Sequence, residues 1–413
     1  MHLSNRFSFI LVYYSKFWAK LIVADYNDIG GIRYEWSKKI QVLQDVIRIP
    51  SVNGKEAEVA SYLSKLFIDY SIESERVPYC PGRDNLVVTI STGHGKVLGL
   101  SGHMDVVSAG NESMWNYPPF EAHIEGNRLY GRGSTDMKAG LMAMVIAMIE
   151  LKEEGCPFNG TIKLLATVGE EVGELGAEQL TKEGYTDDLD ALIIGEPTGY
   201  VLGYAHKGSI NYTVVSNGKE AHSSMPQEGY NAIRRLNDCI MVFNQKMDKI
   251  SNDYINEELG KTIHNVTIIH GGTQINSIPN KAIAQGNIRT IPEFDNGKVI
   301  ALLKETIAQL NQDNLFPLEL TINYNKIPVE ANKNSTLIQA IQKQFDTPLP
   351  VLGGPATTDA AEFIKSQKQF DIVVFGPGVT TVPHQINEYV EISNYFEQID
   401  IYKKIITTYL SDE

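Results

Sequence analysis

The sequence predicts an α/β fold in which a mixed, mostly parallel sheet is flanked by helices and carries an inserted α+β unit. Three observations support this prediction. The 413 residues of the chain exceed the roughly 250–300 that one hydrophobic core usually serves, which favours two domains. Strand-like and helix-like segments alternate in the first and last parts of the chain, as in sheets covered by helices. The middle part has the different order β-α-β-β-α-β, which is typical of a compact unit with its own antiparallel sheet.

The elements of the first and last parts follow from the spacing of apolar residues. Residues 36–66 have a helical pattern that breaks near Ser51 and Gly54, after which Val59, Leu63 and Phe67 recur on one side. Short apolar runs predict strands at 85–90, 96–100, 161–168, 191–194 and 371–375, and longer runs predict helices at 137–151 and 393–410. We expect residues 34–207 and 326–413 to form one discontinuous domain.

Residues 208–325 are expected to form the inserted domain. Strand patterns cover residues 207–217, 265–270, 282–289 and 318–325. Helical patterns cover residues 231–249 and 299–311. The two helices and the antiparallel sheet would make a compact unit inserted into the first domain.

Composition and charge exclude some classes of protein. Hydrophobic residues make up 43% and charged residues 21% of the chain, which is typical of folded globular proteins rather than disordered ones. Lys and Arg number 36 against 50 Asp and Glu, a formal charge of −14, which argues against a nucleic-acid-binding surface. The three cysteines are far apart and form no CxxC pair, so neither a disulfide framework nor a thiolate zinc site is indicated.

The first 33 residues are predicted to be an extension of unknown role, and an upstream start codon is the preferred explanation. The apolar run FSFILVYY is interrupted by Lys16 and Lys20, well short of the roughly 20 residues that a membrane span needs. No small-residue cleavage site of a signal peptide follows it. We therefore expect a cytoplasmic protein that does not bind membranes.

Candidate ligands gather in five short segments, each at the end of a predicted strand or in the loop after it. In open α/β sheets, ligands bind at the carboxyl ends of the strands. The segment GLSGHMDVV contains His103 and Asp105, which share one face of an extended chain, so Asp105 can orient the imidazole. The segment YGRGSTDMKAG places Asp136 at the start of a predicted helix, where a helix cap is the simpler interpretation.

The other three segments add carboxylates and a second histidine. ATVGEEVG contains Glu170 and Glu171, which would point different ways on an extended chain and hold separate roles, although a solvated acidic turn is the simpler interpretation. IGEPTG contains Glu196 after an apolar strand, and VPHQINE contains His384. Two histidines and three carboxylates suit a pair of borderline divalent ions, zinc first, with cobalt or manganese as alternatives. Each segment is a weak signal, but five in this order are a strong one.

From about Val42 to its end, the chain resembles the co-catalytic zinc acylases, a family that includes acetylornithine deacetylase, succinyl-diaminopimelate desuccinylase, aminoacylase and carboxypeptidase G. The matching motifs are SGHMDVV, GRGSTDMKAG, TVGEEVG, GEPT and PHQINE. The resemblance implies that one metal ion is held by His103 and Glu196, and the other by Glu171 and His384. It also implies that Asp136 bridges both ions, with Glu170 as general base and Asp105 as the aspartate that supports His103.

The resemblance extends to the inserted domain, which in this family is a lid that mediates dimerisation. GKEAHSSMP matches the segment that delivers a histidine into the partner's active site, which nominates His222 as a donor to the developing oxyanion. GGTQINSIPN and NIRTIP match lid segments that contact substrate, which nominates Asn276 and Arg289. We therefore expect a homodimer that forms through the lid.

The expected reaction is hydrolysis of the amide bond of an N-acyl amino acid by metal-bound hydroxide, with Glu170 moving the proton. Lys207, Thr357 and Thr358 lie in segments that resemble the substrate loops of the desuccinylases, with changes. N-succinyl-L,L-diaminopimelate desuccinylase, an enzyme of lysine biosynthesis, is the leading expectation. The alternatives are acetylornithine deacetylase, another N-acyl-amino-acid deacylase, a dipeptidase and, from another class, a two-metal phosphoesterase.

Overall fold

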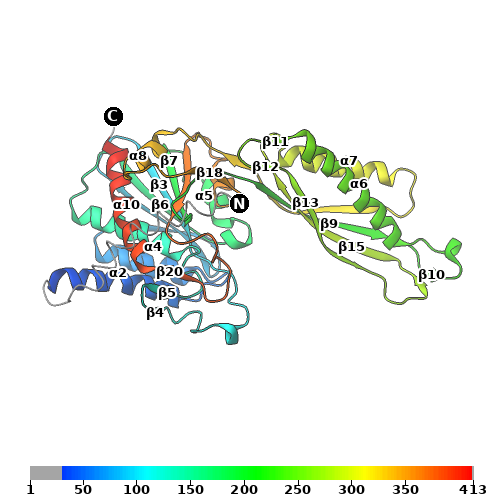
Figure 1. The fold of residues 1–413 in the computed structure, drawn as a ribbon, viewed down its shortest axis with the longest axis horizontal. Coiled ribbons are helices and arrows are strands. Elements are labelled where there is room, and N and C mark those ends of the chain that lie inside the picture. Colours follow the sequence, from blue (N-terminus) through cyan, green and yellow to red (C-terminus); the bar gives the residue numbers. More distant parts are fainter. Residues whose placement is uncertain (1–29, 412–413) are drawn as a thin grey trace.

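The computed structural model describes residues 30–411, which form a large sheet covered by helices and a second sheet that extends from it (Figure 1). The large sheet has nine strands in the order β1-β2-β6-β3-β7-β19-β8-β17, with β18 paired to β8. The central strands β6, β3, β7 and β19 run parallel, whereas β1, β2 and β17 are antiparallel to their neighbours. These strands are β1 (Ser74–Cys80), β2 (Arg83–Ser91), β3 (Val97–His103), β6 (Thr161–Thr167), β7 (Ala191–Pro197), β8 (Leu202–His206), β17 (Val329–Glu330), β18 (Val351–Gly354) and β19 (Asp371–Gly376).

Helices cover both faces of the large sheet. One face packs against α4 (Lys138–Glu153), α10 (Ile392–Ser411), α2 (Gly30–Arg48), α3 (Ala57–Asp69) and α8 (Thr336–Gln342), and the other against α5 (Leu175–Lys182) and α9 (Ala360–Phe363). Because the central strands are buried on both faces, they are apolar along their length rather than alternating.

Helix α4 lies directly on the middle of the large sheet. It is buried on almost every side, which explains its continuous run of apolar residues. A Cβ added at Gly140 of α4 would lie 1.9 Å from the carbonyl oxygen of Gly195 in β7. Only glycine permits this close approach, which brings the start of α4 next to the carboxyl end of β7.

The second sheet is antiparallel, with the order β13-β15-β9-β16. Alternate residues of β15 are buried against α6 and α7, while β13 is an exposed edge strand. The chain enters through β9 and leaves through β16. The elements are β9 (Gly208–Asn217), α6 (Ala232–Asp253), β13 (Ile263–Gly271), β15 (Lys281–Thr290), α7 (Asn296–Asn311) and β16 (Leu318–Lys326), with short pairs β10 (Ala221–His222) with β14 (Ser277–Ile278) and β11 (Ile255–Asn256) with β12 (Gly260–Lys261).

A third, small sheet has the order β20-β5-β4 and lies beside the start of α4. Its strands are β20 (Tyr389–Glu391), β5 (Arg128–Tyr130) and β4 (His123–Glu125), and single 3₁₀ turns occur at η1 (Glu112–Met114), η2 (Glu170–Val172) and η3 (Pro226–Glu228). Every strand and helix that the sequence predicts is present within a few residues of its expected bounds. Most of the predicted extension, residues 1–29, lies outside the described residues. Among the residues that are described, no helix is both long and apolar enough to cross a membrane.

Candidate metal centre

Neighbouring strands of the large sheet deliver three of the five predicted ligands. His103 is the last residue of β3, Glu196 is in β7, and Glu171 is in η2, just after β6. Because β6, β3 and β7 run parallel side by side, their carboxyl ends lie at the same edge of the sheet. Asp136 comes from the loop before α4 and His384 from the loop between β19 and β20.

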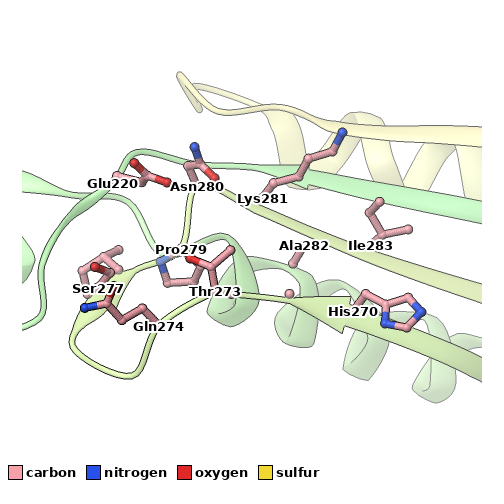
Figure 2. Close-up of a pocket in the computed structure, with 13 residues that line it drawn as sticks. Glu220, His270, Thr273, Gln274, Ser277, Pro279, Asn280, Lys281, Ala282 and Ile283 are labelled. Carbon is pink, nitrogen blue, oxygen red and sulfur yellow. The ribbon is translucent and has the colours of Figure 1, made fainter.

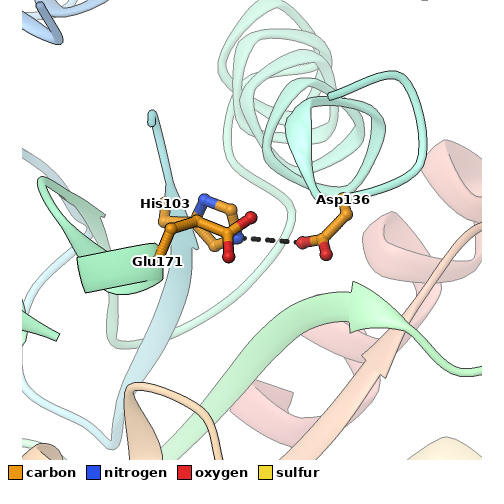
Figure 3. A group of neighbouring side chains, drawn as sticks. All are labelled: His103, Asp136 and Glu171. Carbon is orange, nitrogen blue, oxygen red and sulfur yellow. Dashed lines mark hydrogen bonds and ion pairs between the residues drawn. The ribbon is translucent and has the colours of Figure 1, made fainter. Parts of the chain in front are cut away.

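All five predicted ligands converge at this edge, and Figure 3 shows three of them. The His103 Nε2 atom lies 3.0 Å from Asp136 Oδ1 and 3.4 Å from Glu196 Oε1. The His384 Nε2 atom lies 3.3 Å from the other Asp136 oxygen, Oδ2, and 3.0 Å from Glu171. Asp136 thus lies between two histidines with one oxygen toward each. It does not cap α4, whose N-cap residue is Met137.

Glu170 belongs to the same cluster. Its carboxylate lies with His103 and Glu196 in a group whose donor atoms are all within 4.8 Å of one another. The expectation that Glu170 and Glu171 lie on an extended segment is wrong, because they form a 3₁₀ turn that follows Gly169 at φ 65°. The turn still separates their side chains, since Glu171 contacts His384.

Asp105 supports the cluster in a different way from the one expected. The His103 Nδ1 atom is hydrogen-bonded to the backbone carbonyl of Asp105 at 2.9 Å, whereas the nearer carboxylate oxygen is 3.7 Å away. The carboxylate instead accepts hydrogen bonds from the backbone N–H groups of Glu170 and Glu171, at 3.1 and 3.2 Å. Asp105 therefore orients His103 through its carbonyl and holds the Glu170–Glu171 turn through its side chain.

Burial and crowding shift the pKa values of the cluster in a consistent way. Burial and nearby carboxylates raise the pKa of Glu170 and of Glu196 well above the usual range, although His103 opposes this. Burial alone would lower the pKa of His103, but the surrounding carboxylates raise it well above its usual value. Hydrogen bonds to the carboxylates raise the pKa of His384 to about 10. The carboxylates repel one another at neutral pH, and a bound cation would relieve that repulsion.

Two acidic residues that the sequence interpretation did not nominate lie close to this cluster. Asp359 is buried, and its Oδ2 atom accepts a hydrogen bond from the Thr167 hydroxyl at 2.7 Å, next to His103 in the sheet. Burial raises the pKa of Asp359 to about 7. Glu388 is buried against the loop that carries Asp136. Asp359 directly follows the nominated Thr358, and Glu388 ends the VPHQINE segment, but nothing in the sequence shows that their side chains turn inward.

His222 and Asn276 lie elsewhere, at the end of the second sheet that is far from the large sheet (Figure 1). They are neighbours, because Ser223 donates its backbone N–H to the Asn276 carbonyl at 2.9 Å. His222 is exposed, and its Nδ1 atom accepts the backbone N–H of Ser224 at 3.2 Å. Since Nδ1 is the acceptor, a neutral His222 carries its proton on Nε2, which is free to donate.

The other nominated residues lie where the two sheets join. Lys207 is buried between β8 and β9, its ammonium group donates to the Lys261 carbonyl, and burial lowers its pKa. Arg289 pairs with Ser209 across β15 and β9. Thr357 hydrogen-bonds to Tyr324 of β16. The hydroxyl of Thr358 accepts the Ala360 N–H at 3.2 Å.

A pocket of about 410 Å³ lies on the second sheet (Figure 2), and its lining includes no residue of the acidic cluster. Its lining includes Glu220, His270 and Lys281, together with the loop around Thr273 and Gln274. The mixture of charges does not single out one class of ligand. The chemistry-bearing groups therefore gather at the edge of the large sheet rather than in this pocket.

The fold and the cluster define a metal-dependent hydrolase, and comparisons with known proteins agree. A profile of Peptidase family M20/M25/M40 matches residues 99–408. The chain is 40% identical over 406 residues to the "Probable succinyl-diaminopimelate desuccinylase" of Staphylococcus aureus (strain MSSA476), covering 91% of this chain and 98% of that protein. It is 29% identical over 376 residues to a peptidase M20 domain-containing protein of Schizosaccharomyces pombe, covering 89% of this chain and 84% of that protein.

Solved structures share the fold. The M20 family metallo-carboxypeptidase Sso-CP2 of Sulfolobus solfataricus superposes with a TM-score of 0.76 at 21% identity, covering 90% of this chain and 99% of that one. The aminopeptidase PepT of Bacillus cereus superposes with a TM-score of 0.73 at 21% identity, covering 91% of this chain and 98% of that one. The chain belongs to Peptidase family M20/M25/M40 and is a hydrolase that acts on amide bonds. This membership favours amide hydrolysis over the phosphoesterase alternative.

Proposed function

We propose that this protein hydrolyses the amide bond of an N-acyl amino acid, with N-succinyl-L,L-diaminopimelate as the leading substrate. The observation that carries the proposal is the convergence of two histidines and three carboxylates at the edge of the large sheet, namely His103, Asp136, Glu171, Glu196 and His384. The leading substrate is supported by near-full-length relatives at about 40% identity that carry the desuccinylase name. We take residues 208–325 as the inserted domain, since β9 begins at Gly208 and β16 ends at Lys326.

The geometry of the cluster fits a pair of divalent cations. Two donors on one tetrahedral ion with bonds of about 2.0–2.1 Å lie roughly 3.3 Å apart. The separations from His103 to Asp136 and Glu196 are 3.0 and 3.4 Å, and those from His384 to Asp136 and Glu171 are 3.3 and 3.0 Å. One ion would therefore be held by His103 and Glu196, the other by His384 and Glu171, with Asp136 shared.

Zinc is the leading choice of metal, with cobalt or manganese as alternatives, because the donors are nitrogen and oxygen. When bound, two such cations lower the pKa of a shared water and polarise the carbonyl of the amide. The protein's own contribution is to hold the donors in place and to keep the carboxylates paired with positive charge rather than with protons.

Glu170 is the group that moves the proton. Its carboxylate faces the cluster beside His103 and Glu196, and its backbone is held by Asp105. It would take a proton from the attacking water and return that proton to the nitrogen of the leaving amine as the carbon–nitrogen bond breaks. His222, with its proton on Nε2, would donate a hydrogen bond to the oxyanion that forms on the carbonyl oxygen.

Because β10, which ends at His222, lies at the far end of the second sheet (Figure 1), His222 would act in the site of a second copy of the chain. We therefore propose a homodimer that forms through the inserted domain. Asn276 lies beside His222 and would reach the same substrate. Arg289 offers a guanidinium group for a substrate carboxylate, whereas Lys207, whose buried ammonium group donates to the Lys261 carbonyl, would act through its charge alone. Thr357 and Thr358 offer hydroxyl groups on the loop before Asp359.

Acetylornithine deacetylase, other N-acyl-amino-acid deacylases and dipeptidases use the same chemistry and differ in substrate contacts. The proposal is tested by assaying the purified protein, loaded in turn with zinc, cobalt and manganese, against N-succinyl-L,L-diaminopimelate, N-acetylornithine, other N-acyl amino acids and dipeptides. The expected result is a kcat/KM for the succinyl substrate that exceeds all others. A dipeptide as the best substrate would replace the desuccinylase with a peptidase. No amide hydrolysis with any metal would overturn the proposal.

A further inference from the structure

Glu388, which the proposed reaction does not use, makes an unusually complete set of hydrogen bonds. It lies just before β20, and 1% of its surface is exposed. One carboxylate oxygen accepts the backbone N–H groups of Thr135 at 2.8 Å and Asp136 at 3.0 Å. The other accepts the N–H of Gly133 at 3.0 Å and the guanidinium of Arg132 at 2.7 Å. The carboxylate thus organises the backbone that presents Asp136.

Arg132 extends this arrangement to the second histidine of the cluster. Its guanidinium group is buried, with 3% of the side chain exposed, and pairs with Glu388 through Nη1. Its other terminal nitrogen, Nη2, donates to the backbone carbonyl of His384 at 3.3 Å. His384 itself has a φ of 62°, a conformation that non-glycine residues seldom adopt unless their surroundings enforce it. Glu388 and Arg132 therefore connect the two loops that carry Asp136 and His384.

We propose that Glu388, acting with Arg132, is a positioning residue that fixes the separation of Asp136 and His384 and so sets the affinity of the site for its second cation. This inference rests on the proposed function, in which Asp136 is shared and His384 binds one of the ions. Asp136 and Glu388 are 252 residues apart in the sequence. The relative position of their two loops therefore depends on contacts such as these. Carboxylates and cations outside the ligand set commonly change metal affinity 10- to 100-fold when removed.

The chemistry of the pair favours a positioning role that only a carboxylate can fill. All four donors point at oxygen atoms that carry negative charge, and each oxygen accepts two of them. An amide at position 388 has one accepting oxygen and one NH₂ group that would face two donors. In either orientation of the amide, the two donors that face its NH₂ group lose their hydrogen bonds. Arg132 is also left buried without its counter-charge.

The test compares Glu388→Gln with the matched control Glu391→Gln, which makes the same change three residues further on, opposite Arg128 in the small sheet. The affinities of the metal-free proteins for both zinc ions would be measured by competition with a chelator, and the visible spectrum of the cobalt-loaded proteins would report the coordination of each site. We expect Glu388→Gln to bind one of the two ions about 10- to 100-fold more weakly and to show an altered cobalt spectrum. Glu391→Gln should match the wild type in both measurements.

Wild-type affinity for both ions in a folded Glu388→Gln variant would overturn the inference. If that variant does not fold, Arg132→Lys decides, because lysine keeps the positive charge beside Glu388 but has one terminal nitrogen in place of the two that bind Glu388 and the His384 carbonyl. Weakened binding of one ion with an unchanged melting temperature supports the inference, and unchanged binding refutes it. A His384→Ala variant distinguishes failure of this inference from failure of the proposed metal site. If the wild type and His384→Ala bind the same number of ions, the proposed metal site itself fails.

Discussion

Glu170 is the residue whose replacement separates metal binding from turnover. Its carboxylate belongs to the cluster, but in the proposed site both ions are held by other residues. We expect Glu170→Gln to retain both ions and to lower kcat by about 10²- to 10⁴-fold, the usual contribution of a general base. Metal analysis together with steady-state kinetics checks this. Glu178→Gln, at a half-buried residue of α5 outside the cluster, is the control. Near-normal turnover in Glu170→Gln would mean that another group moves the proton.

His384 is the residue that tests the second ion. Its Nε2 atom lies between Asp136 and Glu171, so its removal takes one donor from a single proposed ion. We expect His384→Ala to contain about one ion per chain rather than two after dialysis against buffer with low free zinc, and to lose most activity. The exposed His94 provides the control, His94→Ala. Two retained ions in His384→Ala would contradict its role as a ligand.

At the scale of elements, the junction between β8 and β9 makes stability depend on pH. His206 ends β8 with 4% of its surface exposed, and its Nε2 atom has no hydrogen-bond partner among the described residues. Burial lowers the pKa of His206 to about 4. In the unfolded chain the pKa is about 6.5, so the unfolded state takes up a proton first. The stability that neutral His206 contributes is complete above the unfolded pKa and is lost as the pH falls from there toward 4.

The measurable consequence is a difference between the wild type and His206→Gln. On going from pH 7 to pH 5, the wild type should lose about 2 kcal/mol more unfolding free energy than the variant, which cannot take up that proton. Chemical denaturation at both pH values measures this, with His94→Gln as the control. Parallel losses in the wild type and His206→Gln would show that His206 is protonated in the folded protein as readily as in the unfolded one.

The elements show what a single sequence can predict. Long periodic segments such as α6 and β15 were predicted within a few residues because apolar spacing decides where they pack, and α4 was predicted from its long apolar run. The three-residue strands of the small sheet were missed, since pairs such as Val390 with Leu129 join distant segments that carry too little pattern. The 3₁₀ turn at Glu170 was also missed, because Gly169 at φ 65° bends the chain out of β6.

The sequence could predict which residues form the site but not how those residues contact one another. Motif order nominated the five proposed metal ligands and Glu170, because most of them follow a strand whose carboxyl end lies at that edge, but it did not nominate Asp359 or Glu388. The sequence could not show that Asp105 holds His103 through a backbone carbonyl. Nor could it show that Glu388 receives the N–H groups of a loop more than two hundred residues away. Such contacts depend on tertiary packing rather than on local pattern.

At the scale of the whole molecule, β13 is the feature that bears on assembly. It is an edge strand that exposes apolar side chains, with Ile263, Ile268 and Ile269 at 45%, 43% and 58% of their full exposure. Exposed apolar edges favour pairing with another strand. This supports the proposed homodimer, in which the inserted domain of one chain brings His222 to the other chain.

The dimer proposal predicts complementation between two inactive variants. Glu170→Gln lacks the base and His222→Ala lacks the oxyanion donor, but a mixed dimer has one site with Glu170 from one chain and His222 from the other. Co-expression of the two variants should restore about a quarter of wild-type activity, since about half of the dimers are mixed and each has one complete site. Expression of each variant alone is the control. No recovery, with mixed dimers shown to form, would place His222 in its own chain's site or outside catalysis.

The two histidines of the cluster differ in their access to solvent. The His103 side chain is 1% exposed, whereas that of His384 is 54% exposed. Zinc held on the His384 side would therefore exchange with chelators sooner than zinc held on the His103 side. Brief treatment with a chelator should give biphasic metal loss, and preparations from different laboratories would be expected to differ in occupancy of the outer position alone.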